Sequence, residues 1–120
     1  MFEIKTDGSS RLVFLIWKWA FKVPKIHNYN YSYGRLYSFC IGIKNNILEY
    51  EFSKLQNPYL CPVIFHIRGL LNVMPRLKVL TDQEYSALII TDDLVIHIVE
   101  HKSTSWGWLY NKPVAIDYGD

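Results

Sequence analysis

Alternating and continuous apolar runs in the first 75 residues predict two β-hairpins. Residues 11–17 and 19–24 are rich in β-branched and aromatic residues, and only Lys18 separates them. Pro24 ends the second run, because proline cannot continue a hydrogen-bonded strand. Residues 62–67 and 70–74 form another apolar pair around Arg68-Gly69, which Pro75 ends. We therefore expect one hairpin over residues 11–24 and another over residues 62–74.

Between these hairpins, apolar positions from Tyr31 to about Leu55 recur at helical spacing. They are three to five residues apart or adjacent: Leu36, Phe39, Cys40, Ile43, Ile47 and Phe52. Asn57-Pro58 ends the predicted helix. Gly34 and Gly42 can interrupt it, so the segment predicts one long helix or two shorter helices.

The chain after Pro75 predicts a helix and a third hairpin. Thr81 and Glu84 have capping-box spacing, which predicts a helix over about residues 81–90. Residues 93–99 favour a strand, with a helix as the alternative. Residues 106–110 and 113–117 flank Asn111-Lys112 and predict the last hairpin. This order indicates an α+β fold in one domain over residues 1–120, with a long helix packed on an antiparallel sheet.

Composition narrows the classes of partner. Half of the residues are hydrophobic and 16% are aromatic, which argues against disorder and predicts aromatic surface for an interface. The net charge of +2 comes from dispersed residues, so nucleic-acid binding is not expected. No apolar run has the length of a membrane span, and polar residues occupy the N-terminus, so we expect a cytoplasmic protein without a signal peptide. Cys40 and Cys61 lie in apolar surroundings and predict free, buried and unreactive thiols.

Three segments resemble the N-terminal lobe of protein kinases. "AFKVP" is similar to the kinase strand whose lysine contacts the α- and β-phosphates of ATP, which implies that role for Lys22. "NNILEYEFSKL" resembles the helix whose glutamate pairs with that lysine, and this implies Glu49, with Glu51 as the alternative. "LLNVMPRLKVLT" resembles the hinge that binds adenine, near Met74 and Arg76.

The end of the chain resembles the kinase catalytic loop and metal-binding triplet. In "EHKSTSWG", Glu100 takes the place of the catalytic aspartate, Lys102 matches the loop lysine, and Ser105 replaces the asparagine that binds metal. Asp117 opens "DYG", which resembles the triplet whose aspartate holds the Mg²⁺ of bound ATP. The resemblance implies cofactor contacts from Lys22, Glu49 and Asp117, and metal contacts from Asp117 and Ser105.

Departures from the kinase pattern predict a kinase-like fold more than kinase activity. Only Gly8 stands where the phosphate-covering loop should carry several glycines, and one residue follows Gly119 where the substrate platform would continue. We therefore expect a pseudokinase-like protein-interaction module, similar to small phage proteins and plausible as an inhibitor of a host protein, such as an anti-CRISPR or other anti-defence protein. The alternative is an ATP- and Mg²⁺-binding protein whose weak phosphotransfer a partner completes.

Other motifs favour less specific hypotheses. "HIVEH" matches a zinc-hydrolase pattern through His97, Glu100 and His101. Such enzymes need a third protein ligand, and we do not expect one from the few residues that follow His101 in this sequence. His27 and His66 are expected to be surface or hydrogen-bonded residues. Tyr29, Tyr31 and Tyr33 form an aromatic-polar stretch that predicts either a protein-binding surface or local packing, in equal measure. The aromatic surplus also makes a homodimer a reasonable expectation.

Overall fold

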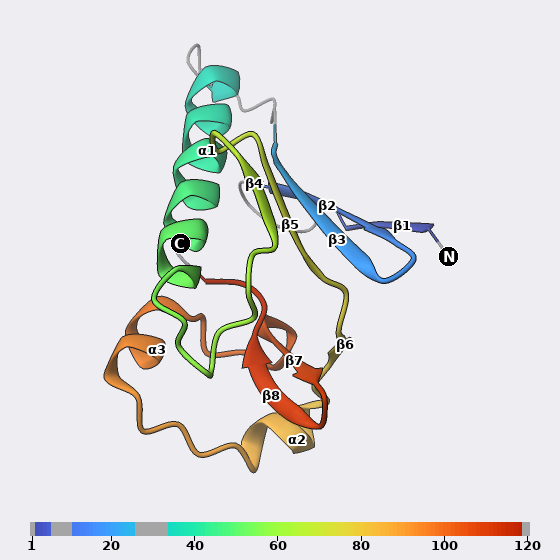
Figure 1. The fold of residues 1–120 in the computed structure, drawn as a ribbon, viewed down its shortest axis with the longest axis vertical. Helices are drawn as coiled ribbons and strands as arrows, with labels where there is room; N and C mark the ends of the chain where they lie inside the picture. The colour runs from blue at the N-terminus through green and yellow to red at the C-terminus, as the bar shows by residue number, and fades with distance from the viewer. Residues whose placement is uncertain (1, 6–10, 26–33, 119–120) are drawn as a thin grey trace.

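The two predicted hairpins share one antiparallel sheet in the computed structural model, which describes residues 2–5, 11–25 and 34–118. The sheet has the order β1-β2-β3-β5-β4 (Figure 1). Its strands are β1 (Phe2–Lys5), β2 (Arg11–Ile16), β3 (Trp19–Pro24), β4 (Phe65–Ile67) and β5 (Leu71–Pro75). Both hairpins are confirmed, and β3 joins them by pairing with β5. The sequence did not predict β1, which adds a fifth strand beside β2.

The register of this sheet gives it two very different faces. Lys5 lies opposite Val13, Val13 opposite Lys22, and Lys22 opposite Asn72, so these four side chains share one face. We call it the inner face, because α1 (Gly34–Ser53) packs on it and Lys22 and Asn72 are buried there. The residues between them point to the outer face, which no described element covers.

The segment from residue 31 to 55 forms one helix over its described part, so the alternative of two helices is wrong. Helix α1 runs through Gly42 without a break. It ends at Ser53, followed by Gln56 at a φ of 56°, the left-handed conformation that commonly closes a helix. Asn57-Pro58 therefore follows the helix end, as predicted.

Two short helices follow the sheet. The capping box is confirmed, since the Glu84 amide donates to Thr81 Oγ1 at 3.1 Å and the Thr81 amide donates to Glu84 Oε1 at 2.8 Å. The helix α2 (Asp82–Ser86) is shorter than predicted.

The strand expected over residues 93–99 is wrong, because this segment forms the helix α3 (Asp93–Ile98). Asp92 caps it, accepting from the Val95 amide at 3.2 Å, and Asn57 Nδ2 holds the other Asp92 oxygen at 3.0 Å. This cap outweighs the strand preference of the β-branched residues that follow.

The last hairpin belongs to a second, three-stranded sheet. It comprises β6 (Lys78–Val79), β7 (Trp106–Leu109) and β8 (Lys112–Ala115), and a short 3₁₀ helix (Ser103–Ser105) precedes β7. The predicted hairpin is confirmed, with its turn at Tyr110-Asn111, both at positive φ.

The main apolar core lies around this second sheet. Its largest buried side chains include Trp106, Tyr118 and Met74. The expected α+β class is confirmed by the two antiparallel sheets and the separate helices. None of the helices in the described ranges combines the length and the apolar character needed to cross a membrane.

Candidate functional site

Four charged side chains from distant parts of the chain meet beneath the inner face. Arg11 begins β2, Lys22 lies in β3, Glu49 lies in α1, and Asp117 follows β8. The structure thus brings together Lys22, Glu49 and Asp117, the three residues that the sequence placed at one cofactor site. It also adds Arg11, which the sequence analysis missed.

Glu49 is the centre of this cluster and is fully buried. Its Oε2 accepts from Lys22 Nζ at 2.8 Å and from the Tyr118 amide at 3.3 Å. Its Oε1 accepts from Arg11 Nη1 at 2.9 Å and from Asn72 Nδ2 at 3.2 Å. Two cations and two polar donors therefore offset the cost of burying this carboxylate. The alternative Glu51 is exposed and pairs with Lys54 instead.

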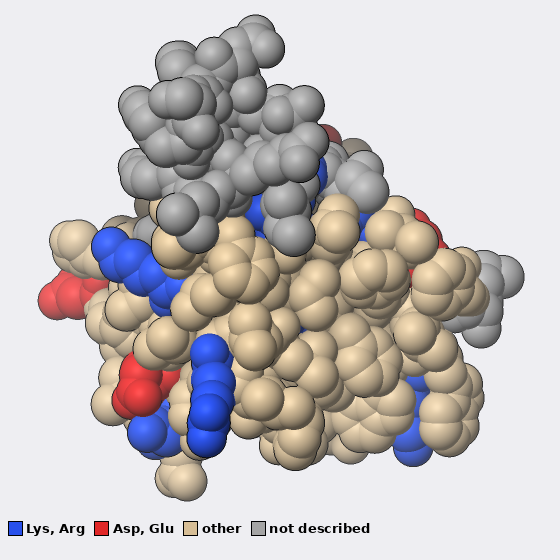
Figure 2. All heavy atoms as spheres, turned by 90° about the horizontal axis from the view of Figure 1, so that it is seen from above, with Lys and Arg blue, Asp and Glu red and all other residues tan. Residues whose placement is uncertain are grey.

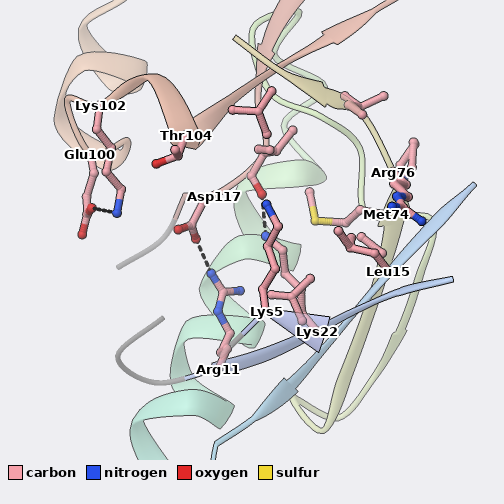
Figure 3. Close-up of a pocket in the computed structure, with 16 residues that line it drawn as sticks. Lys5, Arg11, Leu15, Lys22, Met74, Arg76, Glu100, Lys102, Thr104 and Asp117 are labelled. Carbon is pink, nitrogen blue, oxygen red and sulfur yellow. Dashed lines mark hydrogen bonds and ion pairs between the residues drawn. The ribbon is translucent and has the colours of Figure 1, made fainter. Parts of the chain in front are cut away.

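Arg11 connects the cluster to the end of the chain. Its Nη2 donates to Asp117 Oδ1 at 2.5 Å, while its Nη1 also reaches Asn46 Oδ1 at 3.2 Å (Figure 3). Lys22 makes a second link to the same segment, because its Nζ donates to the Ile116 carbonyl at 2.5 Å. The segment at residues 116–118 is therefore held by the inner face of the sheet and by α1 together.

Two buried asparagines fix the backbone around the charges. Asn46 Nδ2 donates to the carbonyls of Lys22 and Gly69, at 3.1 and 2.9 Å. Asn72 Nδ2 donates to the Asn46 carbonyl at 2.9 Å, and its Oδ1 lies 2.6 Å from His66 Nδ1. Gly69 has a φ of +78°, and a Cβ there would lie 2.6 Å from an Ile43 methyl group, so a side chain has no room at this turn. These amides set the positions of α1, β3 and β5 relative to one another.

Asp117 remains ionised in this setting. Burial raises its pKa, but the positive charges of Lys22, Arg11 and Lys102 lower it by more, so the net pKa lies below the ordinary value of 3.8. The four charges then balance at neutral pH, two positive and two negative, as a partly buried cluster requires.

A pocket of about 330 Å³ opens beside this cluster, between the inner face and the loop before β7. Glu100 and Lys102 lie at the left of Figure 3, and Leu15 and Met74 at the right, with Arg11 and Asp117 facing one another between them. The pocket has an apolar wall: Val13, Leu15, Ala20, Met74, Pro75, Leu77, Val79 and Ile116. No aromatic side chain is among its described lining residues, so no aromatic residue of the described ranges fills the space.

The charged lining of the pocket has an excess of three positive charges. Five lining residues are basic, namely Lys5, Arg11, Lys22, Arg76 and Lys102, and two are acidic, namely Glu100 and Asp117. Lys5 comes from β1, which the sequence analysis also missed. The pocket therefore suits a ligand that has an apolar body and an anionic end.

The residues expected to form a catalytic loop lie at this pocket only in part. Glu100 and Lys102 line it and pair with each other at 2.9 Å, both more than half exposed. Ser105 does not line it; Thr104 does. The Ser105 hydroxyl is buried and has no hydrogen-bond partner among the described residues, while its carbonyl accepts from the Ile116 amide at 2.8 Å.

The donor atoms near Asp117 do not suit the Mg²⁺ site that the sequence predicted. Mg²⁺ binds through carboxylate oxygens in a strict octahedral geometry. Arg11 already holds the Asp117 carboxylate, and the buried Ser105 side chain lies outside the pocket lining. Within residues 2–5, 11–25 and 34–118, no three His, Cys, Asp or Glu side chains are grouped so that they could hold a metal ion.

The other predicted motifs do not join this site. His97 and His101 make separate contacts with the carbonyls of Asp93 and Ile96, and α3 ends before His101. His66 is hydrogen-bonded, as expected. His27, Tyr29, Tyr31 and Tyr33 lie outside the described residues.

The two cysteines have very different environments, and the expectation that both are buried is wrong for Cys40, which is exposed on α1. Cys61 is fully buried, and burial raises the pKa of its thiol to about 12. At neutral pH this thiol is almost entirely protonated and therefore a poor nucleophile.

We expect a thiol reagent such as Ellman's reagent to label Cys40 rapidly in the folded protein and Cys61 only after unfolding. Absorbance of the released thiolate, with and without guanidinium chloride, measures both. In Cys40→Ser the folded protein should give no rapid signal. Rapid labelling of that variant would contradict the burial of Cys61.

Comparisons with known proteins leave the site to be interpreted from its own geometry. No family model matches this chain. No curated protein and no solved structure gives a match either.

Proposed function

We propose that this chain binds a nucleotide in the pocket beneath the inner face and does not transfer its phosphoryl group. The observation that carries the proposal is the convergence of Lys22, Glu49 and Asp117 beside an open pocket with one apolar wall. These are the residues that the resemblance to kinases assigns to ATP binding. The resemblance supports the proposal, and the pocket supports it independently.

The apolar wall suits the base and the basic residues suit the phosphates. A planar base can lie against Ala20, Leu15 and Met74, whose side chains carry no charge. Lys5 lines the same pocket and forms no ion pair with another described residue, so its ammonium group is placed to bind a phosphate there. Lys22 keeps its pair with Glu49 and adds positive potential at the same end.

The pairing of Arg11 with Asp117 is the reason to propose binding without transfer. Phosphoryl transfer in kinases depends on a metal ion held by the aspartate that Asp117 resembles. Here a guanidinium group occupies that carboxylate, and a fixed cation stands where the metal would bring its charge. The residues of this chain therefore supply charge for phosphate binding but not the ligands for a metal.

Calorimetric titration with ATP, in Mg²⁺ and in EDTA, tests this proposal. We expect binding in both buffers. Asp117→Asn should bind ATP as well as the wild type or several-fold more tightly, because the substitution removes a negative charge and releases Arg11 toward the phosphates. Lys5→Gln should weaken binding several-fold, whereas Lys44→Gln, the same change on an exposed lysine outside the pocket lining, should not.

Two results would contradict the proposal. Absence of binding at millimolar ATP would exclude a nucleotide site. Binding that requires Mg²⁺ and is lost in Asp117→Asn would instead favour the metal-dependent alternative with partner-completed transfer.

The second candidate function is the protein-interaction module, and a separate observation favours it. The outer face of the five-stranded sheet is apolar and no described element covers it, which is unusual for a free protein surface. An inhibitor of a host protein would need such a surface. The identity of a host target, including any anti-defence role, rests on the resemblance to small phage proteins alone.

A further inference from the structure

The outer face of the five-stranded sheet is apolar throughout, which is unusual for a face that no described element covers. A sheet with one covered face normally buries apolar residues and shows polar residues to solvent. Here the covered inner face combines apolar side chains such as Met74 with the buried polar residues Arg11, Lys22 and Asn72. The outer face carries thirteen described side chains, two each from β1 and β4 and three each from β2, β3 and β5, and all are apolar.

None of these thirteen side chains is buried. Phe2, Ile4, Ile16, Phe65 and Ile67 are between 42% and 58% exposed, although large apolar residues are usually the most buried. Figure 2, which views the molecule from above, shows a broad area without charged side chains. Such a patch marks an interaction surface, because monomeric proteins rarely leave one this large in water.

We propose that this outer face is a dimer interface on which a second copy of the chain packs. A partner for an uncharged, apolar face must itself be uncharged and apolar there, and a second copy of the chain carries such a face. Two such faces related by a two-fold axis are self-complementary and form a β-sandwich, with the strands of the two sheets inclined by about 30°.

The size of the face agrees with a weak, concentration-dependent dimer. The strands β1 to β5 are three to six residues long. With a rise of about 3.3 Å per residue and a spacing of about 4.8 Å between strands, they give a footprint of roughly 380 Å² on each copy. Both copies together then cover roughly 760 Å², which is the size of a weak interface and below the about 1,000 Å² of a stable one. The charged residues Lys18 and Arg68 lie in the turns at opposite ends of the face, where they remain in water.

Sedimentation velocity from low to high micromolar protein tests this proposal. We expect the wild type to sediment as a dimer at high concentration. Ile16→Glu and Phe65→Glu should each raise the dimer dissociation constant by about 100-fold. Two-fold symmetry places every substitution in the interface twice, and each of the two substituted side chains raises the dissociation constant by about tenfold.

Ile89→Glu is the matched control. Ile89 is 83% exposed and lies outside the sheet, so the same chemical change there should leave the dimer intact. Circular dichroism of each variant checks that it is folded. A wild type that stays monomeric at all concentrations would overturn the proposal without any variant, and so would a dimer that neither face substitution weakens.

Further measurements show whether the outer face binds something other than a second copy of the chain. Binding of a monomeric wild type to neutral phosphatidylcholine vesicles in flotation would show that the face binds lipid instead. ATP titration of the monomeric Ile16→Glu variant keeps the two proposals separate, because the pocket lies on the inner face and should bind ATP in either oligomeric state.

Discussion

Glu49→Gln is expected to lower the free energy of unfolding by about 3–5 kcal/mol, as removal of one partner from a buried ion pair does. The substitution keeps the shape of the side chain and removes its charge. Arg11 and Lys22 then remain nearly buried, at 6% and 5% exposure, with Asp117 as their remaining carboxylate partner. One of these two nearly buried cations then loses its compensation. Urea denaturation followed by circular dichroism measures the loss.

Glu51→Gln is the matched control for this prediction. Glu51 lies two residues further along the same helix, is exposed, and pairs with Lys54 at 3.2 Å. Loss of that surface pair should cost no more than about 0.5 kcal/mol. Equal losses from the two substitutions would show that the buried cluster contributes nothing particular to stability.

Trp106→Ala is expected to cost about 3–5 kcal/mol, which is the usual cost of removing a large aromatic side chain from a core. Trp106 is 1% exposed and begins β7, where it lies opposite Ala115. It lines the same groove as Val95 and Val99 of the segment that includes α3. Its removal leaves a cavity beside the hairpin that carries Asp117, so it should weaken the site as well as the core.

Trp17→Ala tests whether burial, and not the indole itself, sets this cost. Trp17 is 69% exposed at the tip of the β2–β3 hairpin, where Lys18 Nζ lies 4.6 Å from its ring. Loss of this exposed contact should cost about 1 kcal/mol at most. Thermal unfolding of both variants gives the comparison. A larger loss in Trp17→Ala than in Trp106→Ala would place the core elsewhere.

Local sequence patterns predicted the elements that depend on neighbouring residues. The three hairpins and the Thr81 capping box are of this kind, because a turn or a cap is set by residues close in sequence. The segment at 93–99 was wrongly assigned because Val95, Ile96 and Val99 favour strands, while the cap that starts α3 depends on Asp92 and on distant Asn57. The strand β1 was missed because a four-residue strand is fixed mainly by its pairing with β2.

The candidate site was predictable only where a family resemblance supplied long-range information. Lys22, Glu49 and Asp117 were selected from that resemblance, and they do meet in space. Arg11 could not be selected, because as the first residue of a predicted strand it resembles any exposed arginine. Asn72, a polar residue inside the apolar run "LLNVM", was a usable indication of a buried hydrogen-bonding residue.

The bond between Arg11 and Asp117 joins residues that are 106 positions apart, and this separation has a consequence for folding during synthesis. The strands of the first sheet and α1 leave the ribosome before residues 116–118 do. Until then Glu49 faces two cations and lacks the Tyr118 amide, so burial of these charges is unfavourable. We therefore expect the sheet and the helix to reach their final packing only after residues 116–118 have been made, and contacts between such distant residues form slowly.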